Sequence, residues 1–176
     1  MAISTTKSHI ADAIQLQAKY ESAYLVIGKS TAWTDEENPP EEIADVETVQ
    51  EVIGYKKVKN FSLARPLANG ENEEDVEYPV VSYRDQKWAL VPVSKAYEEK
   101  ARWVYIEAEI QPEEFPNGEY RQVGIHVDLV PKNGLTKQNL LPSEVTDVGT
   151  LRFYENRKAY NLTSNLYSLE QFIVVL

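Results

Sequence analysis

The carboxylates of this chain are the side chains most able to do chemistry, and their spacing favours solvation over catalysis. Glu107 and Glu109, or the neighbours Glu113 and Glu114, could be imagined as the acid and base of a glycosidase. The spacing does not support such a pair, because adjacent carboxylates in a turn are usually just solvated. We therefore expect no catalytic dyad.

The histidines and the absence of catalytic motifs also argue against an enzyme. His9 and His126 are too few for a His-based metal site, and His126 lies on the polar parity of its predicted strand, where we expect a surface residue. The chain has no cysteine and no GxSxG, P-loop, GxGxxG or HExxH motif. We predict that the protein is not an enzyme and uses no cofactor.

Two acidic clusters could in principle hold Ca²⁺. They are Asp35-Glu36-Glu37 and the stretch from Glu71 to Glu77. Neither has the alternating ligand positions and the central Gly of an EF-hand loop. Solvated acidic loops are the better interpretation, and no metal site is predicted.

Charge and composition exclude several classes of partner. A net charge of -10 repels phosphate backbones, and the 18 Lys and Arg form no basic block, so nucleic acid is not an expected partner. The N-terminal sequence MAISTTKSHIADAI has no apolar core of signal-peptide length, and no stretch approaches a membrane span. The absence of cysteine suits folding in a reducing cytoplasm, although secreted proteins without cysteine exist.

The stretch Ala101 to Val130 gives the clearest evidence of fold. Two runs alternate apolar and polar residues: Val104, Ile106, Ala108 and Ile110 share one parity in the first, and Val123, Ile125, Val127 and Leu129 share one parity in the second. A turn through Phe115-Pro116-Asn117-Gly118 separates them. This pattern predicts an antiparallel pair with one face in water.

The rest of the chain predicts a mainly β (α+β) fold. Eleven Tyr and three Trp in 176 residues favour sheets over a helical bundle. We expect an antiparallel two-layer β-sandwich with one N-terminal helix and one or two short helices. The expected elements are a helix over 8–20, a doubly buried strand over 23–28, a helix capped by Asp45 and ending near Gly54, strands over 58–63, 76–83 and 88–91, a helical turn capped by Ser94, a strand over 151–154, a turn over 155–157 and a terminal strand over 171–176.

Length and loop composition predict one domain. At 176 residues the chain fits a single β-sandwich domain over residues 1–176. Long irregular loops are expected at about 29–44, 69–76 and 131–148, which are rich in acidic residues, Pro or Gly.

The first of these loops is the candidate contact with another protein. Trp33 offers a large rigid anchor, and Pro39-Pro40 restricts the loop before it binds. We predict a protein–protein contact formed by Trp33, Asp35, Pro39 and Pro40. The alternative is that Trp33 packs on the protein's own sheet and that the acids only maintain solubility.

Three segments resemble a known family when they are taken in order. YLVIGKSTAWTDEENPP resembles the opening strand and loop of contractile-tail phage baseplate proteins. EFPNGEYRQVGIHVDLVPK and LRFYENRKAYNLTSNLYSLEQFIVVL resemble parts of the T-even phage baseplate wedge subunit eight family, with an aromatic-Arg-Gln and an aromatic-Glu-Asn-Arg motif. The chain is much shorter than that subunit, with only short strands and loops between Val58 and Glu99.

The resemblance implies a virion structural protein, a wedge component that mediates assembly around the hub of a contractile tail. It implies other baseplate wedge and hub proteins as partners, a homodimer within the assembly, and folding in the host cytoplasm before incorporation into the virion. Contacts in the missing insertions cannot be carried over. The alternative function is a β-sandwich binding module of a phage tail that recognises a host-surface carbohydrate or receptor.

Overall fold

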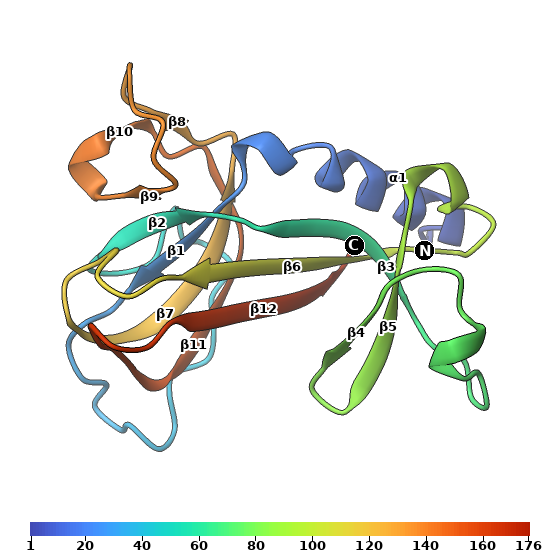
Figure 1. Ribbon diagram of the computed structural model, residues 1–176, viewed down its shortest axis with the longest axis horizontal. Helices are drawn as coiled ribbons and strands as arrows, with labels where there is room; N and C mark the ends of the chain where they lie inside the picture. Colours follow the sequence, from blue (N-terminus) through green and yellow to red (C-terminus); the bar gives the residue numbers. More distant parts are fainter. The chain divides into compact units, whose positions relative to one another are not determined.

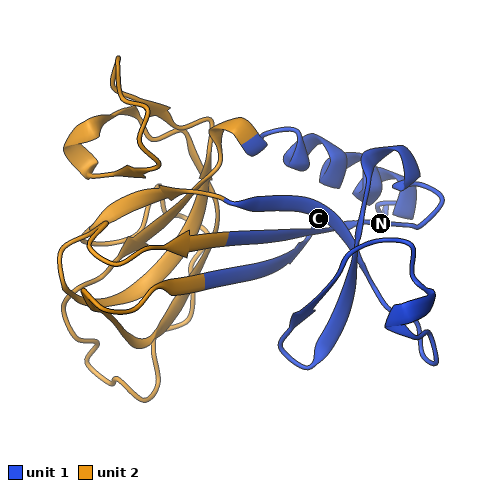
Figure 2. Ribbon diagram, viewed as in Figure 1, with its two compact units in different colours: residues 1–20, 59–107, 170–176 blue, residues 21–58, 108–169 orange.

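The computed structural model describes residues 1–176 and consists mainly of antiparallel β-sheet (Figure 1). The chain forms two compact units, shown in Figure 2. Unit 1 contains residues 1–20, 59–107 and 170–176, and unit 2 contains residues 21–58 and 108–169. Two five-stranded sheets and one N-terminal helix confirm the predicted fold class. The prediction of one sandwich domain stays a prediction.

The sheet of unit 2 has the strand order β11-β7-β1-β2-β9, with antiparallel neighbours. Strand β1, at its centre, is buried along its whole length, as the continuous apolar run predicted. Strand β2 was not predicted. The strands are β1 (Tyr24–Gly28), β2 (Gly54–Lys57), β7 (Gly118–Val127), β9 (Asn139–Leu140) and β11 (Thr150–Leu162).

Both faces of β7 are covered, so the prediction of one face in water was wrong. Val123, Ile125 and Val127 are buried as expected, but Gln122 and His126 are buried too. The segment between β1 and β2 supplies polar partners for them: the Gln50 N–H donates to the Gln122 amide oxygen at 2.7 Å. The sequence pattern of β7 was misleading because its polar residues are satisfied by hydrogen bonds and not by solvent.

His126 was predicted at the surface and has 0% exposure. Its Nδ1–H donates to the Val148 carbonyl at 2.9 Å, so Nε2 accepts from the Thr48 hydroxyl at 3.0 Å. The Tyr55 ring packs edge-on against the imidazole, with centroids 5.7 Å apart. Burial lowers the pKa of His126, and the hydrogen bond to the Val148 carbonyl opposes this shift.

This environment predicts a pH-dependent stability. Because the folded-state pKa of His126 lies below its unfolded value of about 6.5, the unfolded chain takes up the proton first as pH falls. Stability is full above that value and is lost on acidification, by at most about 1.4 kcal/mol per pH unit for one group. Urea unfolding of wild type and His126→Gln between pH 7.5 and 5.5 measures this. A steeper loss in wild type is expected, and parallel curves would contradict it.

The sheet of unit 1 has the order β12-β6-β3-β5-β4. Strands β4 and β5 form a hairpin through Arg84, whose φ is 52°. Strand β4 is an edge strand, and Pro79, which has no backbone N–H to donate, directly precedes it. The strands are β3 (Asn60–Pro66), β4 (Val80–Tyr83), β5 (Gln86–Val91), β6 (Trp103–Ile110) and β12 (Ser168–Val175); β6 and β12 have residues in both units.

The predicted pairing of the two alternating runs was wrong, although both runs are strands. Strand β6 pairs with β3 in one sheet, and β7 pairs with β1 and β11 in the other. The turn between them therefore connects strands of different sheets. The alternation in β6 is confirmed, except that Tyr105 is buried, where its hydroxyl donates to Glu107 at 2.6 Å and accepts from the Gln171 amide at 2.8 Å.

Helix α1 (Thr6–Gln17) confirms the N-terminal helix. The Thr5 side chain caps it by accepting from the Ser8 N–H, and Ile10, Ala13 and Leu16 are buried. The helix packs against β3 in unit 1. It has 12 residues, and no helix here has both the length and the apolar character of a membrane span.

The helix predicted after Asp45 is absent. The backbone of this segment bonds instead to β1 and to the residue that follows it: the Gln50 carbonyl accepts from the Lys29 N–H, and the Ile53 N–H donates to the Ile27 carbonyl. Glu51 has a φ of 46°, which a helix does not accommodate.

The prediction that Ser94 caps a helical turn is also wrong, because the short 3-10 helix there begins after Pro92 without a side-chain cap. The 3-10 helices are η1 (Tyr20–Ser22), η2 (Glu73–Asp75), η3 (Val93–Lys95) and η4 (Pro142–Glu144).

The C-terminal region differs from its prediction in one respect. The turn expected over 155–157 lies within the long strand β11, where the register against β7 shifts between Asn156 and Tyr160. This bulge replaces the turn. Strand β12 lies beside β6 with Phe172 buried, which confirms a paired terminal strand. The loop expected over 131–148 includes β9 and the small β8 (Val130–Pro131) and β10 (Val145–Asp147) pair.

Candidate assembly interface

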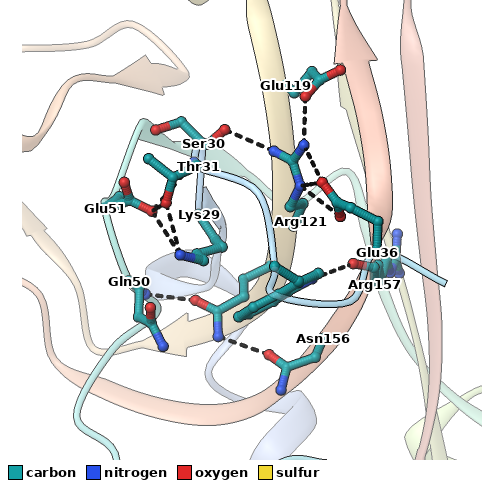
Figure 3. Close-up of polar contacts among 12 residues, drawn as sticks. Lys29, Ser30, Thr31, Glu36, Gln50, Glu51, Glu119, Arg121, Asn156 and Arg157 are labelled. Carbon is teal, nitrogen blue, oxygen red and sulfur yellow. Dashed lines mark hydrogen bonds and ion pairs between the residues drawn. The ribbon is translucent and has the colours of Figure 1, made fainter. Parts of the chain in front are cut away.

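Residues 29–44, which we call the acidic loop, form the candidate interface in unit 2. As predicted, the loop has no helix or strand. Its side chains and backbone bond to β7 and to the bulge of β11, and Figure 3 shows the central contacts. The acidic loop therefore has no regular secondary structure, but hydrogen bonds hold it in a fixed position.

Arg121 of β7 is the main anchor of the acidic loop. Its side chain is 4% exposed. The guanidinium donates to Glu36 at 2.6–3.0 Å, to Glu119 at 2.6 Å and to the Ser30 carbonyl at 2.7 Å. One buried cation thus holds two positions of the loop against the sheet.

Trp33 fastens the middle of the loop to the bulge in β11. Its indole N–H donates to the Arg157 carbonyl at 2.8 Å, and the Lys29 ammonium lies 5.1 Å from the ring centroid. Lys158 of the same strand pairs with Glu37. The Trp33 ring is half-buried, as the alternative of packing on the protein's own sheet implied.

A second set of hydrogen bonds holds the end of the loop. Asn156 donates its backbone N–H to Glu42 and its amide to the Pro40 carbonyl, each at 2.8 Å. The Tyr154 hydroxyl accepts from the Ile43 N–H at 2.6 Å and donates to the Ile43 carbonyl at 2.8 Å. The Ile43 side chain nevertheless remains 63% exposed. The loop therefore presents an apolar side chain from a fixed backbone.

Hydrogen bonds hold the carboxylates of Asp35 and Glu36 in their ionised form. The Arg121 hydrogen bond is the main cause that lowers the pKa of Glu36. A hydrogen bond from the Asn38 side chain is the main cause that lowers the pKa of Asp35. At neutral pH the loop is anionic, and the arrangement suits recognition of cations better than proton transfer.

The predicted contact residues take different positions in this loop. Trp33 and Pro39 are half-buried, whereas Asp35 and Pro40 are exposed. Asp35 accepts from the backbone of Glu37 at 3.0 Å and of Asn38 at 3.3 Å, so it shapes a turn. The four residues lie in one fixed loop, but their roles in any contact differ.

Sequence reasoning missed the residues that hold the loop. They are Arg121, Tyr154, Asn156 and Arg157, and they belong to the aromatic-Arg-Gln and aromatic-Glu-Asn-Arg motifs, whose function the sequence did not reveal. Gln122 joins the two motifs, because its amide donates to the Asn156 side chain at 2.7 Å. No local signal could have identified Asn156 and Arg157, because residues 155–157 were predicted to form a turn.

Neither a metal site nor an exposed Trp platform is found in the structure. No three His, Cys, Asp or Glu side chains are grouped so that they could hold a metal ion. All three Trp side chains are at least partly buried, and Trp88 and Trp103 pack edge to face with centroids 5.8 Å apart. An exposed Trp platform of the kind that binds carbohydrate is therefore absent.

Comparison with known proteins agrees with an assembly role. The family described as "Baseplate wedge 3 tail fiber network component" matches residues 1–176. The "Virion protein 3" of Enterococcus phage phiEF24C is 47% identical over 176 residues, which cover 100% of this chain and 96% of that protein. The prediction of a phage virion protein, and not an enzyme, is confirmed. The chain belongs to the baseplate wedge 3 tail fiber network component family and is a structural protein of the phage baseplate.

Proposed function

We propose that the acidic loop is the surface by which this protein joins its neighbours in the baseplate wedge. The supporting observation is the arrangement at Ile43, whose backbone is fixed by the Tyr154 hydroxyl while its side chain is 63% exposed. A preordered apolar side chain loses little conformational entropy on binding and can act as an interface anchor.

The predicted residues Trp33, Asp35, Pro39 and Pro40 belong to this contact in two ways. Trp33 and Pro39 hold the loop in its binding shape, because both are half-buried. Asp35 and Pro40 are exposed and meet the partner directly. Trp33 thus contributes through preorganisation more than through its own contact area.

The partner surface is basic with an apolar depression. Glu41 and Glu42 precede Ile43 and are exposed, so an acidic rim adjoins the apolar anchor. Such a rim attracts basic neighbours and repels other copies of the same acidic loop. The interaction should weaken at high salt, because exposed charges are screened.

The finer family assignment is part of the same proposal. We infer that the chain is a shortened counterpart of the T-even baseplate wedge subunit eight, in a contractile tail, with wedge and hub proteins as neighbours. A homodimer within the wedge belongs to this proposal. The supporting features are the three ordered segments of resemblance, two of which supply the residues that bind the acidic loop: Arg121, Tyr154, Asn156 and Arg157.

Two substitutions separate binding from folding. Ile43→Ser removes an exposed side chain and leaves both backbone hydrogen bonds, so the Tm of the purified protein is expected to stay unchanged. Incorporation into wedge intermediates is expected to fall at least tenfold, corresponding to about 1.4 kcal/mol. Trp33→Ala should instead lower the Tm, because it leaves the Arg157 carbonyl unpaired.

The matched control is Val148→Ser, which truncates another exposed apolar side chain of unit 2 outside the acidic loop. Incorporation is measured by co-sedimentation of tagged protein with wedge intermediates from infected cells. Full incorporation of Ile43→Ser would refute the loop contact. Equal loss with Val148→Ser would mean that the effect is not specific to the loop.

A further inference from the structure

A small pocket in unit 1 combines three cationic side chains, one of them paired with carboxylates, with an aromatic wall. It has a volume of about 350 Å³ and is lined by Thr6, Arg65, Glu99, Lys100, Arg102 and Trp103, among others. It lies in the unit that does not contain the acidic loop. Its size suits one or two side chains of a ligand and not a folded domain.

The charges of the pocket are not balanced within it. Glu99 is already engaged, because it accepts from Arg65 at 2.6 Å and from the Tyr78 hydroxyl at 3.2 Å. Arg65 also donates to Glu71 at 2.8 and 2.9 Å. Lys100 and Arg102 have no carboxylate partner, so the pocket retains two unpaired positive charges in a protein of net charge -10.

Arg102 is positioned to receive a planar anion. Its guanidinium lies 4.6 Å from the centroid of the Trp103 ring. Such stacking orients the guanidinium and leaves its N–H groups for bidentate hydrogen bonds to a carboxylate. The Trp103 ring in turn packs against Trp88, which supports it from within the same sheet.

Lys100 occupies a backbone position that glycine normally takes. Its φ is 52°, its N–H donates to Tyr97, and the next N–H, of Ala101, donates to Ala96. This is the Schellman pattern at the end of a helical turn, where a side chain at positive φ is disfavoured relative to glycine. A lysine here accepts strain while its side chain lines the pocket.

We propose that this pocket binds a carboxylate of an acidic, extended segment from a neighbouring baseplate protein. Charge complementarity supports this ligand: two unpaired cations and an oriented guanidinium match one carboxylate or two adjacent ones. The overall charge of -10 disfavours a nucleic-acid backbone. The site is independent of the acidic loop and rests on the proposed assembly role only for the source of its ligand.

The test uses the purified full-length protein and a synthetic probe. Ac-Gly-Glu-Glu-Gly-NH₂ is titrated while NMR follows the Trp103 indole N–H and the Arg102 Nε–H. Saturable shifts at both signals are expected, with affinity at least fivefold lower in Arg102→Gln. Arg84→Gln is the matched control, because Arg84 also stacks on an aromatic ring, that of Tyr83, at 5.2 Å outside the pocket.

Two further probes distinguish the alternatives. The corresponding Gln peptide should bind at least fivefold more weakly, and inorganic phosphate should not exceed the Glu peptide in affinity. Equal binding of the Gln peptide, tighter binding of phosphate, or unchanged affinity in Arg102→Gln would each overturn the assignment. The NMR signals lie in unit 1, and the titration needs no other baseplate protein. A negative result for this pocket is therefore distinguishable from a failure of the acidic-loop contact.

Discussion

Val123→Asp is expected to lower the free energy of unfolding by about 4 kcal/mol, because it places an unpaired carboxylate in a dry core. Val123 has 0% exposure on β7, where its neighbours across the sheet are Ile27 and Glu155. Neither offers a cationic partner. A loss of this size approaches the total stability of a typical domain, so urea unfolding of the variant should show a much lower midpoint.

Two controls test whether this effect depends on the burial of the substituted side chain. Val130→Asp changes an exposed valine of unit 2 and should alter stability by no more than about 0.5 kcal/mol. Gln122→Asp should cost about 1–3 kcal/mol, because it breaks buried hydrogen bonds to Gln50 and Asn156. If Val123→Asp were no worse than Val130→Asp, our description of the β7 environment would be wrong.

Arg121→Met should cost about 2–3 kcal/mol and release the acidic loop. The substitution leaves Glu36, Glu119 and the Ser30 carbonyl without their shared donor. The loss stays below that of a fully buried ion pair, because the Glu36 and Glu119 side chains are 37% and 45% exposed and can rehydrate. Urea unfolding gives the energy, and hydrogen exchange over residues 29–44 reports the loop.

Arg121→Lys is the matched control, since it keeps the charge but loses the planar fork of donors. We expect an intermediate loss of stability and a partial rise in loop exchange. Faster exchange in Arg121→Met that stays confined to the loop would show a local anchor. Unchanged exchange there would be incompatible with Arg121 as the residue that holds the loop.

Strands with a continuous or alternating apolar pattern were predictable from sequence, because burial of one or both faces imposes that pattern directly. Strand β1 and the Val104 to Ile110 run of β6 are such cases. Their pairing was not predictable, because parity determines which side chains share a face but not which strand lies alongside. For this reason β6 and β7 were wrongly paired.

The acidic loop was predictable as irregular but not as fixed. Pro39-Pro40 and the run of acids exclude regular structure, yet the hydrogen bonds that hold the loop to β7 and β11 come from residues more than 80 positions away, such as Arg121 and Asn156. Local patterns carry no information about such contacts. The same reason explains His126, whose burial depends on Thr48 and Val148.

The central claim, that the acidic loop contacts another baseplate protein, is tested most directly by photo-crosslinking in assembled particles. A benzophenone amino acid is placed at Ile43, and in a second strain at Val148, both exposed positions of unit 2. We predict a covalent adduct with a different baseplate protein from position 43 and a much weaker one from position 148. Particles that incorporate the position 43 variant normally, yet give no adduct on irradiation, would contradict the claim.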